Sequence, residues 1–113
     1  MDDFISNAEK FIAGHLQDGF TLDEIAHFCG YSPFHFTRKF KKAVNQTVME
    51  YVREKRVFAA SEMIKNGFSI CNSAMEYGFE THAGFTKAFN TVFGCCPRDY
   101  AAHCCGNYWR GYD

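Results

Sequence analysis

The sequence has few of the features that would make a long linker or a membrane span. It contains two prolines in 113 residues and no serine- or glycine-rich run, which argues against a long disordered linker. No apolar run approaches the ~18 residues that a membrane span needs. The acidic start, Met1-Asp2-Asp3-Phe4, is unlike a secretory signal. We therefore expect a soluble cytoplasmic protein that folds as one compact domain or two small lobes.

Motifs for catalysis are also missing. The sequence has no glycine-rich loop of the kind that cradles phosphate, no H-E-x-x-H and no G-x-S-x-G. We therefore expect no enzymatic activity, no catalytic residues and no cofactor.

The six cysteines do not form a pattern that favours a disulfide framework or a metal site. Without a secretion signal they are expected to be reduced thiols. The one cluster of metal-ligating types is Cys95-Cys96 with His103-Cys104-Cys105, and adjacent cysteines point their side chains apart, so we predict no metal site. Cys29 and Cys71 are expected to be packing residues.

An excess of one charge is absent overall but present locally. The formal net charge is −1. Residues 1–33 hold one lysine and six acids, whereas residues 34–65 hold eight lysines and arginines against three acids. One third of the chain is thus a basic zone that the total conceals. This zone suits a nucleic-acid surface or, alternatively, an ordinary solvated helix face.

What the sequence does contain is a repeat of about fifty residues. Residues 22–31 align with residues 70–79, and alanine, glycine and an aromatic residue recur in register. After one extra residue, Glu80, residues 32–40 align with residues 81–89, and both carry the pattern Phe-Thr-basic-x-Phe. The aligned pairs are Phe36/Phe85, Thr37/Thr86, Arg38/Lys87, Phe40/Phe89, Val44/Phe93, Asn45/Gly94 and Tyr51/Tyr100. The chain therefore holds two copies of one structural unit.

The first copy has the signals of two helices joined by a tight turn. Thr21 is a suitable N-cap for a helix over residues 22–29, and Gly30 can take the positive φ that ends this helix. Ser32 caps a second helix, in which Pro33 occupies the first position at no cost in hydrogen bonding.

The second helix of each copy has an apolar and a polar face. Phe36, Phe40 and Val44 lie at i, i+4 and i+8 and are predicted to point inward. Asn45 and Gly94 tolerate left-handed geometry and are predicted to end these helices. A short helix, a turn and an exposed polar second helix are typical of the helix-turn-helix.

The segment between the copies, from residue 47 to about 65, is predicted to be one long amphipathic helix. About 18 residues at about 1.5 Å each span roughly 27 Å. With the width of the two lobes added, this length can hold two recognition helices about one DNA turn, ~34 Å, apart. With an opening helix over residues 2–16 and a last helix from Pro97, the fold class is all-α with about seven helices. We expect helix-turn-helix subdomains at 1–50 and 67–105, a linker helix at 51–66, and a tail or the start of a further domain at 106–113.

Taken together, these segments resemble the AraC/XylS family of transcription regulators, from roughly residue 5 to residue 100. The segments that carry the resemblance are Thr21-Leu-Asp-Glu-Ile-Ala26, Gly30-Tyr-Ser32, His35-Phe-Thr-Arg38-x-Phe40-Lys41, Tyr51-Val-Arg53, Arg56, Tyr77-Gly-Phe79, Phe85-Thr-Lys-Ala-Phe89 and Phe93-Gly94-x-x-Pro97. The resemblance implies that both second helices enter successive major-groove segments on one face of an asymmetric double-stranded DNA site. It also implies that a monomeric domain can occupy such a site. RNA polymerase and an effector domain of the same protein are further partners compatible with it.

Four residues depart from the family pattern. Asn45 stands where glycine is usual, Val48 where proline is usual, and Ser73 where a large aliphatic residue is usual. Gly84 lies inside the second recognition helix and costs about 1 kcal/mol relative to alanine. We therefore expect the second unit to be less stable and to read fewer bases.

The candidate base contacts of the first unit are Phe34, Thr37 and Arg38, which match base-reading positions of the family. Arg38 suits a bidentate contact to guanine, and Phe34 and Thr37 suit a thymine methyl group. The alternatives are a surface charge pair for Arg38 and cover of the lobe interface for Phe34.

The second unit offers weaker candidates for base contact, which are His82, Ala83, Gly84 and Lys87. His82 suits a helix-capping role equally well, and Ala83 and Gly84 have no side-chain donors. Five residues are candidates for phosphate contact: Lys41, Lys42, Gln46, Thr47 and Arg53. Arg56 is favoured as a structural arginine paired with an acid such as Glu24.

Two classes of function therefore stand against each other. The first is sequence-specific double-stranded DNA binding in transcription regulation, which the basic zone favours. The second is a degenerate helical protein-interaction or thiol-based sensor module, which the near-neutral net charge and the weakened second unit favour.

Overall fold

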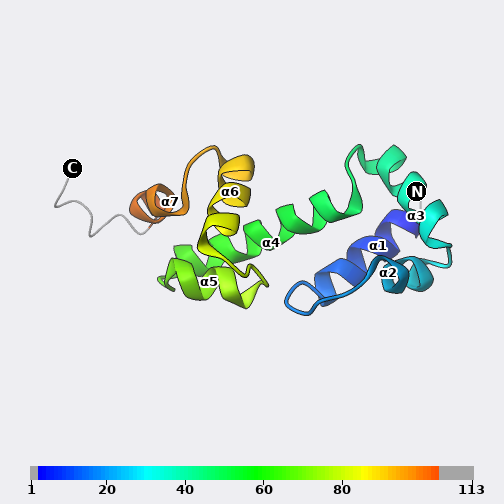
Figure 1. The fold of residues 1–113 in the computed structure, drawn as a ribbon, viewed down its shortest axis with the longest axis horizontal. Helices are drawn as coiled ribbons and strands as arrows, with labels where there is room; N and C mark the ends of the chain where they lie inside the picture. The colour runs from blue at the N-terminus through cyan, green and yellow to red at the C-terminus, as the bar shows by residue number, and fades with distance from the viewer. Residues whose placement is uncertain (1–2, 105–113) are drawn as a thin grey trace. The chain divides into compact units, whose positions relative to one another are not determined.

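The structure, a computed structural model, describes residues 3–104. This part of the chain forms seven helices and no strand, which confirms the all-α fold class (Figure 1). The helices are α1 (Asp3–Gly14), α2 (Leu22–Cys29), α3 (Pro33–Val44), α4 (Val48–Lys65), α5 (Ile70–Glu76), α6 (His82–Phe93) and α7 (Pro97–Cys104). The chain divides into two compact units, Met1–Arg53 and Glu54–Asp113. The predicted tail at 106–113 lies outside the described residues.

The core of the first unit takes one buried face from each of its helices. Phe36 and Phe40 of α3 are fully buried at its centre, with ring centroids 5.7 Å apart. The other buried members are Phe4, Ala8, Ile12, Ile25, Ala26, Val48 and Val52. The i, i+4 spacing of the two phenylalanines therefore sets which side of α3 faces outward.

Local signals place α2 and α3 as the sequence predicts. Thr21 and Glu24 form a capping box, in which the Thr21 N–H donates to Glu24 Oε1 at 2.9 Å and the Glu24 N–H donates to Thr21 Oγ1 at 3.1 Å. Gly30 has a φ of 83° at the end of α2, and Asn45 takes the same left-handed region at the end of α3, with a φ of 65°. The Ser32 hydroxyl accepts from the N–H of His35 at 3.3 Å.

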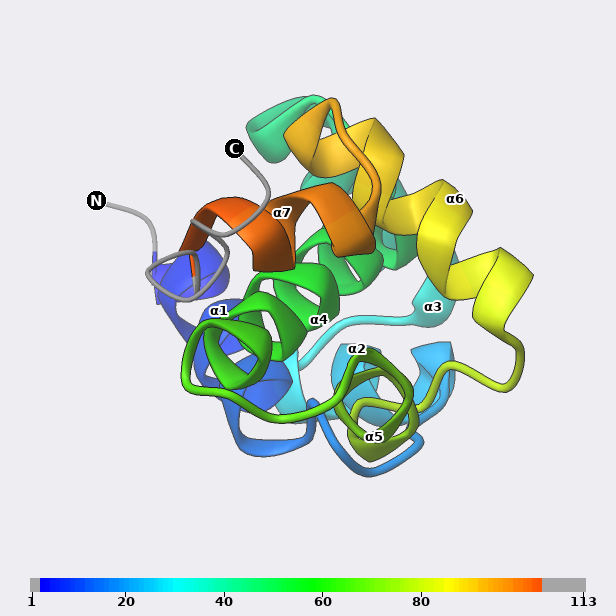
Figure 2. The ribbon, with the colours of Figure 1, turned by 90° about the vertical axis from the view of Figure 1, so that its left-hand side faces the viewer.

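The second unit repeats this architecture around its own core. Phe85 and Phe89 of α6 are fully buried, 5.6 Å apart. Their partners are Val57, Ala60, Ile64, Ala74 and Ala88. α7 lies beside α6 (Figure 2), because Tyr100 packs edge-on against Phe89 at 5.2 Å. Gly94 ends α6 in the left-handed region, as predicted.

Ser73 of α5 is fully buried in the second unit. Its hydroxyl donates to the Ser69 carbonyl oxygen at 2.8 Å, the same oxygen that the Ser73 N–H reaches at 3.0 Å. The hydroxyl is therefore satisfied within its own helix and needs no partner from the core.

Three predictions about the helices and their buried residues are wrong. The opening helix ends at Gly14 and not at Leu16, because glycine is a poor helix former. The linker helix does not carry a single apolar stripe, because its buried residues Val52 and Val57 are five positions apart, which is about 140° around a helix. Cys71 is exposed on α5, with its Sγ 3.9 Å from Met75 Sδ.

Cys29, by contrast, is a packing residue. It is half-buried against the core of the first unit, and this burial raises the pKa of its thiol.

We predict that Ser73 tolerates alanine but not leucine. Ser73→Ala loses a hydrogen bond of about 1 kcal/mol and gains up to about 0.7 kcal/mol of helix propensity, so the free energy of unfolding should change little. Ser73→Leu overpacks a filled site and should cost about 1–3 kcal/mol. Urea denaturation measures both, and a stabilising leucine would show that the core around α5 has unfilled room.

Candidate nucleic-acid interface

The outward face of α3 begins with an aromatic residue and an arginine. The ring of Phe34 is 71% exposed, the highest exposure among the large apolar side chains that the structure describes. The guanidinium carbon of Arg38, one turn along the helix, lies 5.6 Å from its centroid, within the range of a cation–π contact. Arg38 forms no ion pair among the described residues, so its charge is available to a ligand.

Thr37 is less accessible than its two neighbours in the predicted set. It is half-buried, between the core face and the outer face of α3. Lys41 and Lys42, in the last turn of the same helix, are exposed.

A second group of basic side chains lies along one flank of α3. A pocket of about 360 Å³ on this flank is lined by Tyr31, His35, Arg38, Lys39 and Lys42. The Lys39 ammonium lies 5.3 Å from the ring centroid of Phe4 and 5.8 Å from that of Tyr31. Tyr31, His35 and Lys39 were not predicted as contacts, although the spacing 35, 39, 42 places these three positions on one flank of the helix.

The start of α4 carries a second capping box. The Thr47 N–H donates to Glu50 Oε1 at 3.0 Å, and the Glu50 N–H donates to the Thr47 hydroxyl at 3.1 Å. Thr47, predicted as a phosphate contact, therefore caps α4, and these bonds occupy the N–H groups of Thr47 and Glu50 at the start of this helix. Glu50 was missed, although Thr-x-x-Glu is the sequence signature of this motif.

The surroundings of Glu50 stabilise its negative charge. The hydrogen bond from the Thr47 backbone is the largest influence that lowers the pKa of this carboxyl group, and the Thr47 hydroxyl and the charges of Lys41 and Arg53 lower it further against a small desolvation effect. A carboxylate thus lies among the candidate phosphate contacts Lys41, Thr47 and Arg53, of which Arg53 is exposed and Thr47, like Gln46, is half-buried.

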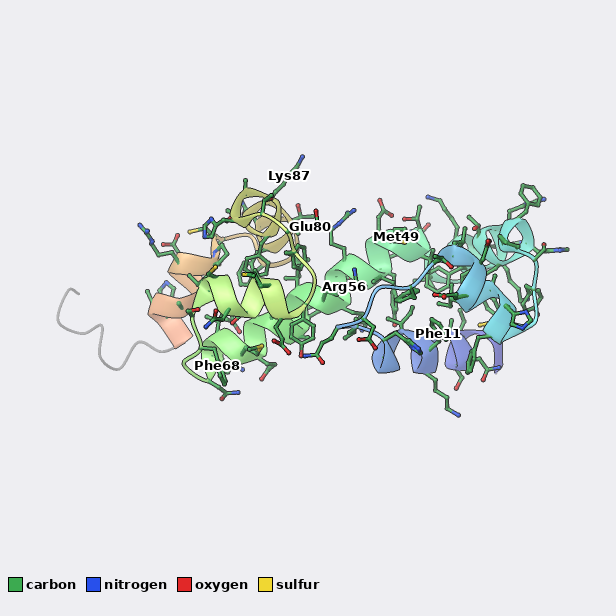
Figure 3. All side chains as sticks on the ribbon, turned by 60° about the horizontal axis from the view of Figure 1, so that its bottom comes forward. Phe11, Met49, Arg56, Phe68, Glu80 and Lys87 are labelled. Carbon is green, nitrogen blue, oxygen red and sulfur yellow. The ribbon has the colours of Figure 1, made fainter. Side chains whose placement is uncertain are left out.

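The first turn of α6 presents less charge than α3. His82, Ala83 and Gly84 are exposed, and Thr81 caps the helix by accepting from the Gly84 N–H at 3.0 Å. Lys87 extends from α6 away from the ribbon (Figure 3) and is the only lysine or arginine of this helix.

Two of these positions are constrained by their neighbours in the helix. His82 Nδ1 lies 3.5 Å from the Thr86 hydroxyl, which draws the imidazole along the helix surface. A Cβ atom at residue 84 would lie 3.0 Å from the hydroxyl of Thr81, so the glycine leaves room for this cap.

Arg56 of α4 is half-buried, and this burial lowers the pKa of its guanidinium. Glu24, the acid predicted to pair with it, holds the Thr21 N–H in the capping box of α2. The role of Arg56 as a structural arginine stays a prediction.

Two classes of site find no support in residues 3–104. No group of three or more histidine, cysteine, aspartate or glutamate side chains is placed to hold a metal ion in this range. No helix in the described residues is long and apolar enough to cross a membrane.

We predict that the capping box of α4 makes stability depend on pH. Thr47→Ala should lower the free energy of unfolding by about 1 kcal/mol. Glu50→Gln keeps an acceptor but removes the charge. Because the folded-state pKa of Glu50 is lowered, its charge stabilises the fold above the unfolded-state pKa, and this stability is lost as the pH falls through the folded-state pKa.

Urea denaturation from neutral to acidic pH tests this prediction. Wild type should be more stable than Glu50→Gln at neutral pH, and the two should converge in acid. Glu80→Gln, an exposed residue between α5 and α6, is the matched control. Wild-type and Glu50→Gln curves that run parallel at all pH values would contradict the role of the charge.

Known proteins share both the sequence pattern and the fold. Residues 25–103 match the family described as "Helix-turn-helix domain". The HTH-type transcriptional activator AarP of Providencia stuartii is 33% identical over 97 residues, which cover 85% of this chain and 72% of AarP.

Two solved structures have the same fold. A transcriptional regulator of Chromobacterium violaceum with an AraC-type DNA-binding domain superposes with a TM-score of 0.86 at 21% identity, covering 93% of this chain and 95% of that one. The DNA-binding domain of AdpA, solved in complex with a target DNA, superposes with a TM-score of 0.80 at 19% identity over 100% of both chains.

Proposed function

The chain belongs to the AraC/XylS family of helix-turn-helix transcription regulators, which bind double-stranded DNA, and on that premise we propose that α3 reads most of the sequence and α6 reads less. The observation that carries the proposal is the exposed Phe34–Arg38 pair. It lies on the face of α3 that is opposite the buried Phe36 and Phe40.

The chemistry of α3 suits the major groove. Arg38 forms no ion pair within residues 3–104, and its planar guanidinium matches O6 and N7 of a guanine. Phe34 exposes apolar surface that gains free energy when it packs on a thymine methyl group. Thr37 is half-buried at the edge of this face and contacts a base edge only at close approach.

α6 supplies a smaller share of base recognition. Lys87 is its one cation, and it contacts a base or a phosphate. His82 contributes a ring donor at the first position of the helix, whereas Ala83 and Gly84 permit close approach and read shape or a methyl group. The site is therefore asymmetric, with a half-site for α3 and a weaker half-site for α6 in successive major-groove segments.

The phosphate contacts in this proposal surround the end of α3 and the start of α4. Lys41, Lys42 and Arg53 are exposed and supply charge, and Gln46 and Thr47 supply neutral donors or acceptors. Glu50 reduces the positive charge of this surface. Its carboxylate repels a phosphate that approaches the cap of α4, so the lysines and Arg53 carry most of the attraction.

Two further partners belong to the proposal. AarP is named a transcriptional activator, and an activator acts on RNA polymerase, so we include a contact with RNA polymerase. An effector domain elsewhere in the same protein is the second. A protein-interaction or thiol-sensor module without DNA binding is not favoured, because the relatives are DNA-binding regulators.

We predict that selection from a randomised duplex library enriches an asymmetric site of ~15–20 base pairs. Arg38→Ala should weaken binding by about 1–3 kcal/mol and relax the preference at one position, because one bidentate guanine contact is lost. Lys87→Ala should have a smaller effect. Fluorescence anisotropy on the enriched duplex and its single-base variants measures both quantities.

Arg98→Ala is the matched control, since Arg98 is an exposed arginine on α7. This variant should leave the preference at every position unchanged. The proposal fails if no sequence is enriched, or if Arg38→Ala and Arg98→Ala bind all duplexes alike.

A further inference from the structure

We infer that the pocket on the flank of α3, lined by Tyr31, His35, Arg38, Lys39 and Lys42, binds one backbone phosphate of the DNA. The inference rests on the proposed function and adds three residues that neither the sequence pattern nor the proposed base contacts include. It also fixes which flank of α3 faces one of the two strands.

The positions of the side chains around α3 divide its outer surface into two flanks. At about 100° per residue, Arg38 lies in the middle of the outward face. Phe34 and Lys41 lie on one side of it, and His35, Lys39 and Lys42 lie on the other side. A helix in the major groove has a phosphate backbone on either side. The side with three basic residues therefore faces one backbone while Arg38 reaches the bases.

Lys39 is held in place before any ligand binds. Its ammonium contacts two aromatic rings, that of Phe4, which is 4% exposed, and that of Tyr31. A free lysine side chain loses about 2 kcal/mol of rotamer entropy when it is fixed. Because the two rings already restrict Lys39, it loses less when a phosphate binds.

The positive charge of the pocket is not neutralised by neighbouring acids. His35, Arg38, Lys39 and Lys42 form no ion pair within the part of the chain that the structure describes. Two acids, Asp23 and Glu24, line another hollow that shares Tyr31 with this pocket and also contains His27 and Pro33. Basic groups on one side of Tyr31 and acids on the other steer an anion toward α3.

The donor set matches a phosphodiester. Lysine and arginine give charge-assisted hydrogen bonds to non-bridging oxygens, and a tyrosine hydroxyl and a histidine ring N–H add neutral ones. The DNA backbone is the source of phosphate that this position favours. Arg38 belongs both to the pocket and to the Phe34 pair, so a phosphate held here lies directly beside the bases that α3 reads.

The test is the salt dependence of binding to the enriched duplex. Each lost phosphate contact reduces the slope of log K against log salt concentration by about 0.9. Lys39→Gln should reduce this slope by about one and weaken binding roughly tenfold at ~0.1 M salt, with base preferences unchanged. Lys10→Gln, an exposed lysine on α1, is the matched control and should leave the slope unchanged.

Lys39→Arg separates loss of charge from loss of folding. It keeps a cation that can lie over both rings, so its slope should equal that of wild type. Thermal unfolding of each variant shows that the first unit remains folded at the temperature of the titration. A slope for Lys39→Gln equal to that of Lys10→Gln overturns the inference.

Neutral methylphosphonate linkages locate the phosphate. One linkage should weaken wild-type binding, and the same linkage should have no additional effect on Lys39→Gln. Additive losses at every linkage overturn the inference. Inorganic phosphate is the last probe. If it moves the chemical shifts of His35 and Lys39 while Lys39→Gln leaves the salt dependence of DNA binding unchanged, the pocket binds free phosphate and the inference is overturned. If the duplex selection enriches no sequence, the proposed function is contradicted instead, whatever the result for Lys39→Gln.

Discussion

The burial of two phenylalanines, four residues apart, fixes how each second helix is rotated about its axis. Phe36 and Phe40 in α3, and Phe85 and Phe89 in α6, are all fully buried. Loss of one such ring costs about 3–5 kcal/mol, which is a large part of the stability of a small domain. Rotation that exposes them is therefore excluded, and the residues on the opposite side of the helix are the ones that a ligand meets.

The outward faces of α3 and α6 differ in their side chains, although both helices bury an aligned pair of phenylalanines. In α3 the outward face combines an exposed aromatic ring with lysines and Arg38, whereas in α6 it combines small residues with a single lysine, Lys87. The repeat in the sequence thus predicts the fold of both units, but of the lysines and arginine of α3 only one counterpart, Lys87, recurs in α6. We therefore expect most of the binding free energy to come from the first unit, because the attraction of phosphates scales with the number of cations at the surface.

The parts of the fold that are predictable from the sequence are those decided within a few residues. Caps and helix ends at Thr21, Gly30 and Asn45 depend on one side chain and its neighbours, and the structure confirms them. The two buried faces of α4 and the contact of Lys39 with two rings depend on residues that are distant in sequence, so periodicity alone does not reveal them. Glu50 is different, because its capping box was readable in the sequence and was overlooked.

We propose that the outward faces of α3 and α6 contact DNA, with α3 the stronger. Titration of the isotope-labelled protein with an enriched duplex, followed by the amide chemical shifts, tests it most directly. We expect the largest changes in chemical shift at residues 34–42, smaller ones at residues 82–87, and little change at the exposed faces of α2 and α5. Changes concentrated on α2 or α5, with α3 unaffected, would contradict it.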